Sequence, residues 1–156
     1  MKKPFVMLLV GTPLTGKTFW IRNNYPETTV ISRDEIVMEL WGSRNYSEAF
    51  SKVDHKEVDR VLQQRLVDAG KSSKDVIVDM TNLTPKRRRH TLSYFPDGFT
   101  KIAVVFPTLT DEEYYLRNKK RIEEEQKDLP MSVIKSMISS FEAPTTAEGF
   151  DEIIFL

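Results

Sequence analysis

The sequence predicts an α/β fold in which a five-stranded parallel sheet lies between two layers of helices, a three-layer sandwich. Two observations support this fold class. Five short apolar runs alternate along the chain with longer segments of helical periodicity. Strands that are separated by helices form parallel sheets with helices on both faces. At 156 residues, the chain is expected to be a single domain, 1–156, with one hydrophobic core.

The strands are predicted from apolar runs whose length suits a strand rather than a helix. The five runs are Phe5–Val10, Thr29–Ser32, Asp75–Asp79, Lys101–Phe106 and Glu152–Phe155. We expect the first run to form the central strand, because the motif described below follows it directly and requires a buried parallel strand before it.

The helices are predicted from apolar spacing and from residues that begin or end helices. A glycine ends a helix well, a proline begins one well, and a threonine with a glutamate three residues later forms a capping box. The first expected helix begins after Lys17. Further helices are expected at 34–41, from Ser47 to Ala69 with Gly70 as its end, from Pro85 to about Tyr94, from Thr110 toward Glu125, and at Met131–Phe141. A loop is expected at 42–46, and Pro130 is expected to separate the last two helices.

Composition excludes several classes of protein. The 23 Lys and Arg balance the 23 Asp and Glu, so no net charge attracts the whole chain to nucleic acid or a membrane. The chain has no cysteine, which excludes disulfide partners and thiolate chemistry. No apolar stretch is long enough to span a membrane, and the short run after Lys3 is interpreted as a strand rather than a signal peptide. These features favour a cytoplasmic location.

Residues 11–18 form a complete G-x-x-x-x-G-K-T phosphate loop directly after the first strand. Its glycines allow a tight turn in which successive N–H groups point at a phosphate, and the following helix adds the positive end of its dipole. The nucleotide-binding residues are therefore Gly11, Thr12, Pro13, Leu14, Thr15, Gly16, Lys17 and Thr18. Lys17 is expected to reach the β- and γ-phosphates, and the Thr18 hydroxyl to bind Mg²⁺. The motif thus predicts ATP and Mg²⁺ as cofactors; a glycine turn with a solvated lysine is the alternative.

Two carboxylates follow strands at the sheet edge where this loop lies. Asp34 comes after the second strand, where a carboxylate can accept the proton of an attacking hydroxyl while the γ-phosphoryl group moves in line. The alternative for Asp34 is capping of the next helix. Asp79 ends the third strand and is expected to hold Mg²⁺, often through a water; its alternative is a turn-forming aspartate. Thr81 and Asn82 would then face the same crevice.

Basic residues occur in two further segments. Arg117 and Arg121 are four residues apart on the charged helix, so they share one face and can close over a triphosphate as part of a lid at about 110–130. The alternative is a solvated helix with ion pairs to Glu113, Glu124 or Glu125. The run 86–90, which includes Arg88, can track a phosphate backbone near the acceptor or can form a solvated face.

These residues together resemble the kinase domain of the phage and DNA-repair 5′-hydroxyl polynucleotide kinases, which are P-loop kinases. The resemblance spans nearly the whole chain in the correct order, and the Asp-x-Thr-Asn-Leu-x-Pro run followed by arginines is its most specific part. The matching segments are 11–18, 32–34, 79–85 with the arginines at 87–89, Arg117-x-x-x-Arg121, and 144–150.

The resemblance implies a P-loop kinase fold with a helical lid and assigns roles to matching residues. It implies that Asp34 is the general base, that Arg117 and Arg121 contact the ATP phosphates, and that the loop beginning at Thr145 lies near the adenine. Taken together with the residue patterns above, the expected acceptor contacts are Arg33, Asp34, Thr81, Asn82 and Arg88.

The chain departs from the pattern of its relatives in two ways. The phage enzyme has an arginine shortly after the base that helps to hold the acceptor, and Val37 occupies that position here. Many relatives also carry a phosphatase or ligase module, and no such motif occurs in this sequence, so a stand-alone kinase is expected. The likeness to phage enzymes keeps a phage origin open.

Three functional hypotheses follow. The first is ATP- and Mg²⁺-dependent phosphoryl transfer to the 5′-hydroxyl of a polynucleotide, whose 5′ end would be the partner. The second keeps the chemistry but has a small-molecule acceptor such as a nucleoside, sugar or antibiotic; Val37 and the balanced charge favour it. The third is a non-catalytic ATP-binding switch or toxin-like module, against which Asp34 and the paired lid arginines argue.

Overall fold

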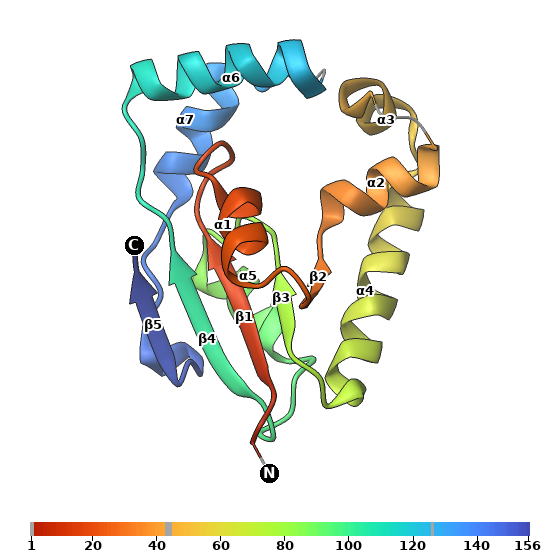
Figure 1. Ribbon diagram of the computed structural model, residues 1–156, viewed down its shortest axis with the longest axis vertical. Helices are drawn as coiled ribbons and strands as arrows, with labels where there is room; N and C mark the ends of the chain where they lie inside the picture. The colour runs from red at the N-terminus through yellow and green to blue at the C-terminus, as the bar shows by residue number, and fades with distance from the viewer. Residues whose placement is uncertain (1, 43–44, 126) are drawn as a thin grey trace.

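The computed structural model describes residues 2–42, 45–125 and 127–156, and its strands form one all-parallel sheet (Figure 1). The strands are β1 (Phe5–Val10), β2 (Thr29–Ile31), β3 (Val76–Val78), β4 (Thr100–Val105) and β5 (Glu152–Phe155). Their order across the sheet is β2-β3-β1-β4-β5. The prediction of a five-stranded parallel sheet with the first strand at its centre is confirmed.

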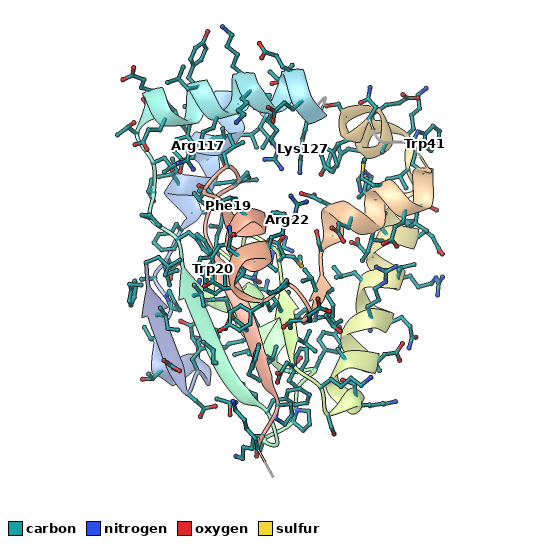
Figure 2. All side chains as sticks on the ribbon, in the orientation of Figure 1. Phe19, Trp20, Arg22, Trp41, Arg117 and Lys127 are labelled. Atoms are coloured by element: carbon teal, nitrogen blue, oxygen red, sulfur yellow. The ribbon has the colours of Figure 1, made fainter. Side chains whose placement is uncertain are left out.

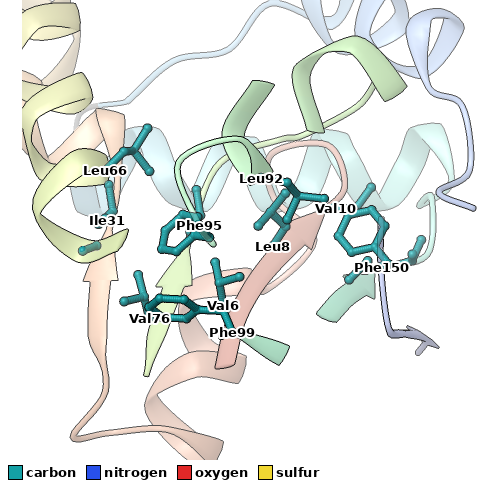
Figure 3. Close-up of a cluster of buried hydrophobic side chains, with 14 residues drawn as sticks. Val6, Leu8, Val10, Ile31, Leu66, Val76, Leu92, Phe95, Phe99 and Phe150 are labelled. Atoms are coloured by element: carbon teal, nitrogen blue, oxygen red, sulfur yellow. The ribbon is translucent and has the colours of Figure 1, made fainter. Parts of the chain in front are cut away.

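Side chains of β1 alternate between two apolar layers, as the pleat of a strand requires. Val6, Leu8 and Val10 belong to a core under α4 (His55–Ser72) and α5 (Pro85–Leu92) (Figure 3). Met7 and Leu9 point to the opposite face, where α1 (Lys17–Asn24) covers the sheet. The sheet therefore lies between helical layers, which confirms the three-layer architecture.

A small group of helices extends from the β2 side of the sheet. The helices α2 (Arg33–Trp41), α3 (Tyr46–Lys52) and α4 pack together through side chains that are completely buried. These side chains belong to Ile36, Val37, Ala49 and Val58. Of the loop expected at 42–46, residues 43 and 44 lie outside the described residues.

The single helix expected from Ser47 to Ala69 is wrong, because the chain forms α3 and α4 with a break at Val53 and Asp54. The Asp54 side chain accepts a hydrogen bond from the Lys56 N–H at 3.0 Å and so caps the start of α4. Aspartate competes for backbone N–H groups in this way and therefore favours helix starts over helix interiors. A continuous apolar stripe concealed this local signal.

Gly70 does not end α4, which continues to Ser72 and ends at Ser73 in the left-handed conformation (φ 56°). The glycine serves packing instead. A Cβ atom at position 70 would overlap the carbonyl oxygen of Tyr94, so only glycine allows the turn after α5 to approach α4 so closely.

The lid, which we define as residues 110–130, crosses above the carboxyl edge of the sheet and extends toward α3 (Figure 1). It contains α6 (Asp111–Glu125), which is followed by α7 (Met131–Ser140). The expected capping box is present, since the Glu113 N–H donates to the Thr110 hydroxyl and the Thr110 N–H donates to the Glu113 carboxylate, both at 3.2 Å. A short 3₁₀ helix, η1 (Thr146–Glu148), was not expected. No helix among the described residues is both long and apolar enough to cross a membrane.

Candidate active site

The phosphate loop joins the carboxyl end of β1 to α1. Gly16 caps the start of α1 in the left-handed region (φ 89°), which glycine adopts without steric cost. The Gly11 N–H donates to the Thr81 carbonyl at 3.0 Å, and the Thr15 hydroxyl donates to the Thr12 carbonyl at 2.9 Å. These bonds hold the loop in a compact turn, and the first of them ties it to the segment that follows β3.

The Lys17 side chain folds back over the phosphate loop. Its ammonium donates to the carbonyls of Gly11 and Thr12, at 2.8 and 2.6 Å. Burial lowers the pKa of Lys17 to about 8, although the nearby Asp79 carboxylate acts to raise it. A partly buried ammonium gains most from a strongly charged partner, and phosphate oxygens are such partners.

A buried tyrosine ties the loop to the start of the lid helix. The Tyr114 hydroxyl shares a 2.6 Å hydrogen bond with the Thr12 hydroxyl and accepts from the Leu109 N–H at 3.2 Å. Tyr114 is completely buried, and Pro13 is half-buried beside Thr12. The Thr12 side chain thus attaches the phosphate loop to Tyr114 on the lid helix. The charged composition of α6 gave no sequence signal for this role of Tyr114.

Asp79 and Thr18 are the two residues expected to bind Mg²⁺. Asp79 follows β3, is half-buried, and has a pKa raised by burial, although the Lys17 ammonium opposes that rise. Thr18 is exposed in the first turn of α1. The described residues contain no cluster of three or more His, Cys, Asp or Glu that could cage a metal. One carboxylate and one hydroxyl suit Mg²⁺, which takes its other ligands from water and substrate phosphates.

Asp34 lies in the first turn of α2 and both of its carboxylate oxygens accept hydrogen bonds. Ser32 is the cap of that helix, so the alternative role of Asp34 as the cap is not observed. The Tyr46 hydroxyl donates to Oδ1 at 2.6 Å, and the Lys127 ammonium donates to Oδ2 at 2.7 Å. Burial raises the pKa of Asp34, but Lys127 and the hydrogen bonds lower it further, so the net pKa lies below its ordinary value. Burial and the Asp34 charge raise the pKa of Tyr46, which keeps its proton.

The lid arginines lie on the side of α6 that faces the phosphate loop. An Arg117 Nη1 donates to the Leu14 carbonyl at 2.8 Å, where the Leu14 backbone adopts the left-handed conformation (φ 71°) that is strained for leucine. Arg121 interacts electrostatically with Lys17, Asp34 and Tyr46, which places it close to these three residues.

The alternative of a solvated helix, with the lid arginines paired to lid glutamates, fits this placement poorly. Glu124 pairs with Lys120 at 4.0 Å. Glu113 accepts hydrogen bonds from Thr110, although Arg117 also lowers its pKa electrostatically. The Glu125 side chain lies outside the described residues.

An open cleft of about 550 Å³ borders the phosphate loop on the α1 side. Its walls come from the loop, α1, the end of β4 and the lid, and include Thr15, Phe19, Trp20, Phe106 and Arg117. Phe19 is 73% exposed, and Figure 2 shows it on α1 below Arg117. An exposed aromatic ring beside a guanidinium forms a surface on which a planar base can stack.

The structure contradicts the expected acceptor contacts of Arg88 and Asn82. Arg88 is completely buried and makes two hydrogen bonds to the Glu148 carboxylate, at 2.6 and 3.2 Å, and one to the Asn82 carbonyl at 2.9 Å. Asn82 is also buried, with its amide donating to the Leu9 carbonyl at 2.8 Å. These residues bind one another, Glu148 and the end of β1, so their side chains are not available to an acceptor.

Two other expected residues have contacts within the protein. Thr145 caps η1 through the Glu148 carboxylate and precedes β5. Its expected place near the adenine stays a prediction. Arg33 pairs with Asp59 at 3.1 Å and contacts the His55 ring at 3.0 Å, so its guanidinium is directed toward α4. Thr81 is half-buried and contributes its carbonyl to the loop.

Sequence reasoning missed Lys127 and Tyr46, the two residues that hold Asp34. They come from the chain beyond α6 and from α3, and neither shares a motif or a helical face with Asp34. The only signal was weak: Lys127 belongs to a lid whose basic residues were expected to close over the cleft.

The comparison with protein families decides the relationship. The family described as an AAA domain matches residues 6–144. The chain belongs to this family. Its fold is that of a P-loop kinase, and the phosphate loop described above lies within the matched residues.

Among curated proteins, the chain is similar to heterogeneous nuclear ribonucleoprotein U-like protein 2 of mouse and human. The identities are 28% and 27% over 161 residues, and both alignments cover 96% of this chain and 21% of the relative. The chain therefore spans about a fifth of the length of the curated relatives that it matches.

Several solved structures share the fold at low sequence identity. A chain of the Pnkp1/Rnl/Hen1 RNA repair complex has a TM-score of 0.72 and 22% identity, covering 97% of this chain and 47% of that one. Kti12 of Chaetomium thermophilum in complex with ADP-AlF3 has a TM-score of 0.66 and 16% identity, covering 97% and 88%. A gluconokinase from Sinorhizobium meliloti has a TM-score of 0.57 and 14% identity, covering 100% and 83%.

Proposed function

We propose that this protein transfers the γ-phosphoryl group of ATP to a hydroxyl, and that the acceptor is the 5′-hydroxyl of a polynucleotide. The observation that carries the proposal is that Asp34, Lys17 and Arg121 lie close enough together to interact electrostatically. A base, a phosphate-binding lysine and a lid arginine are the groups that phosphoryl transfer needs in one place.

In this reaction, the acceptor oxygen forms a bond to the γ-phosphorus while the bond from phosphorus to the ADP oxygen breaks. The acceptor proton passes to a carboxylate oxygen of Asp34, which is ionised at neutral pH because its pKa lies below its ordinary value. Lys17 and Arg121 stabilise the charge that spreads over the phosphate oxygens in the transition state. When bound, Mg²⁺ neutralises charge on the phosphates, and Thr18 and Asp79 would hold it.

The donor base is proposed to lie in the cleft beside Phe19. The cleft borders the phosphate loop directly, so a nucleotide can reach from Gly16 to the Phe19 ring without leaving it. Arg117 lines the same cleft, and its guanidinium can cover the other face of the base. The structure of Kti12 with ADP-AlF3 shows that a protein of this fold binds a nucleotide.

A polynucleotide acceptor is supported by the most specific sequence match and by the comparisons. The match is the run from Asp79 to Pro85, and the similar structures include a chain of an RNA repair complex. A small-molecule acceptor is the second candidate. It is favoured by Val37, which is completely buried and offers no charge to a nucleic-acid strand, and a gluconokinase shares the fold.

The test is transfer of labelled phosphate from ATP to a panel of acceptors in the presence of Mg²⁺. The panel contains 5′-hydroxyl DNA and RNA oligonucleotides, the same oligonucleotides with a 5′-phosphate, nucleosides and gluconate. We expect label on the 5′-hydroxyl oligonucleotides alone, and its loss in Asp34→Asn. Label on a small molecule alone would transfer the proposal to the second candidate. ATP binding without any labelled product would refute kinase activity and favour a nucleotide-binding switch.

A further inference from the structure

The lid contacts both the phosphate loop and the candidate base. On the donor side, Arg117 binds the Leu14 carbonyl of the phosphate loop at 2.8 Å. On the acceptor side, Lys127 binds the Asp34 carboxylate at 2.7 Å. Figure 2 shows both side chains on the side of the lid that faces the sheet. One short piece of chain therefore joins the loop that receives ATP to the candidate base.

The contact between Lys127 and Asp34 is supported by burial of the lysine and by Tyr46. The Lys127 side chain is only 9% exposed, and its ammonium lies 4.0 Å from the centre of the Tyr46 ring. The Tyr46 hydroxyl binds the other oxygen of the same carboxylate at 2.6 Å. A buried ammonium is costly unless it is paired, and an aromatic face and a carboxylate together meet that need.

This arrangement leaves Asp34 accessible to an acceptor. The Asp34 side chain remains 52% exposed although both of its oxygens are engaged. A carboxylate has about four lone-pair positions, so each oxygen can accept a second hydrogen bond. Lys127 and Tyr46 therefore fix the plane of the carboxylate while a hydroxyl can still approach it.

We propose that Lys127 is a positioning residue, through which the lid orients the Asp34 carboxylate for proton abstraction. This inference rests on the proposed function, because it takes Asp34 as the base of phosphoryl transfer. Since Lys127 and Arg121 belong to the same lid, one segment of chain both orients the base and supplies a cation to the transferring phosphoryl group.

The charges around Asp34 indicate how the contact can be measured. Arg121 and Lys127 face Asp34 from the lid, Tyr46 faces it from α3, Lys17 from α1, and Asp79 from the end of β3. Burial raises the pKa of Asp34, and Lys127 is the first of the groups that lower it. Removing one close opposite charge shifts a carboxyl pKa by about 1–3 units. Tyr46 and Arg121 remain in a Lys127 variant, so we expect a rise of about 1 unit.

The first measurement needs no substrate: an NMR titration of the Asp34 carboxyl carbon, assigned with Asp34→Asn. Lys127→Met keeps the length of the side chain and removes its charge, Lys127→Arg keeps the charge, and Lys120→Met is the matched control on the exposed face of the lid. We expect the Asp34 pKa to rise in Lys127→Met and to keep its position in the other two. An unchanged pKa in Lys127→Met would overturn the inference whatever the enzyme's activity.

The second measurement is steady-state phosphoryl transfer to the best acceptor as a function of pH. A base misplaced by about 1 Å costs on the order of 10²-fold in rate, so we expect Lys127→Met to lower plateau kcat by about that factor. The acid limb should move to higher pH, the KM for ATP should stay within about threefold, and Lys127→Arg should recover most of kcat.

The two measurements separate failure of this inference from failure of the proposed function. A loss of kcat with an unmoved acid limb would mean that Lys127 is merely structural, and an unchanged plateau kcat would show that it does not position the base. Either result overturns the inference and leaves the kinase activity standing. A shifted Asp34 pKa with no phosphorylated acceptor in the whole panel would instead refute the proposed function, and the inference with it.

Discussion

The buried pair of Arg88 and Glu148 should be the costliest single ion pair to break among the described residues. Both side chains are withdrawn from water, with exposures of 0% and 2%. The guanidinium makes two hydrogen bonds to Glu148 and one to the Asn82 carbonyl, and the carboxylate also accepts from the Thr145 N–H at 2.8 Å. The pair thus joins the segment after β3 to the segment before β5.

The perturbation is Arg88→Met, which keeps the apolar stem and removes the charge. It leaves the Glu148 carboxylate buried without its counter-charge and the Asn82 carbonyl without a donor. Removing one partner of a buried pair costs about 3–5 kcal/mol. That is a large share of the 5–15 kcal/mol that stabilises a typical domain. For a chain of this size, the loss corresponds to a fall in Tm of about 6–20 °C.

The assay is urea unfolding at pH 7 of a double-mutant cycle that combines Arg88→Met with Glu148→Gln. Glutamine keeps an acceptor for the Thr145 N–H and carries no charge, so the double variant has no buried charge without a partner. We expect it to be more stable than Arg88→Met alone, with a coupling energy of at least about 2 kcal/mol. Arg87→Met, an exposed neighbour on α5, is the control and should change stability by less than about 0.5 kcal/mol.

The pH dependence of the same proteins gives an independent check. Burial raises the pKa of Glu148, but Arg88 and Thr145 lower it further, so its net pKa lies below the ordinary value. A carboxyl with a depressed pKa contributes stability above its unfolded pKa, near 4.3, and loses it as the pH falls through the folded value. The advantage of the wild type over Glu148→Gln should therefore shrink below about pH 4.3. A cost below about 1 kcal/mol for Arg88→Met, or additivity in the cycle, would refute the reasoning.

Four further substitutions test the site and the fold. Lys17→Ala should abolish transfer in a protein that unfolds like the wild type, since the phosphates lose their point charge; full activity would contradict the donor site. Asp34→Asn should keep ATP affinity and lower kcat by about 10²–10⁴-fold, and a loss confined to ATP affinity would make Asp34 a structural or metal residue. Arg121→Lys should lower kcat more than equilibrium ATP binding, because a planar fork suits the spreading charge; an unchanged kcat would support a solvated lid helix. Gly70→Ala should lower Tm although alanine favours helices, because its methyl group meets the Tyr94 carbonyl; a raised Tm would show that the turn after α5 moves freely.

The five strands and the central place of the first one could be predicted from the sequence because local signals and tertiary packing agree there. Each strand is an apolar run, and the phosphate loop marks the end of the central one. Such agreement between local and global preferences is what allows pattern-based inference to succeed. The same reasoning placed Lys17 in the loop and Asp34 at the carboxyl edge of β2, because both follow strands directly.

Apart from the missed helix break at Asp54, the errors arose where a residue's partner is distant in the sequence. The run of arginines at 87–89 looks like a solvated or nucleic-acid-binding face, yet Arg88 is buried because Glu148, sixty positions later, supplies its counter-charge. Nothing near position 88 indicates this partner. Likewise, Gly70 has the local features of a helix end. Glycine is needed at this position because the Tyr94 carbonyl, on another element, lies against it. Pairings of this kind are decided by the fold, and one sequence does not reveal them.

The burial of Val37 explains why the positive charge beside Asp34 comes from Lys127 on the lid and not from α2. Val37 is completely buried against Ala49 and Val58, where α2, α3 and α4 meet, so a charged residue there would lose its hydration without a partner. The packing of these helices therefore excludes from α2 the arginine that the phage enzymes carry. Lys127 brings a positive charge to Asp34 from the lid instead. A charge on α2 would belong to the helix that carries the base, whereas the charge of Lys127 belongs to a separate segment. Reversing this arrangement, with Val37→Arg in a Lys127→Met background, should therefore fail to restore kcat and should lower Tm, because the new guanidinium enters the apolar contact between α2 and α4.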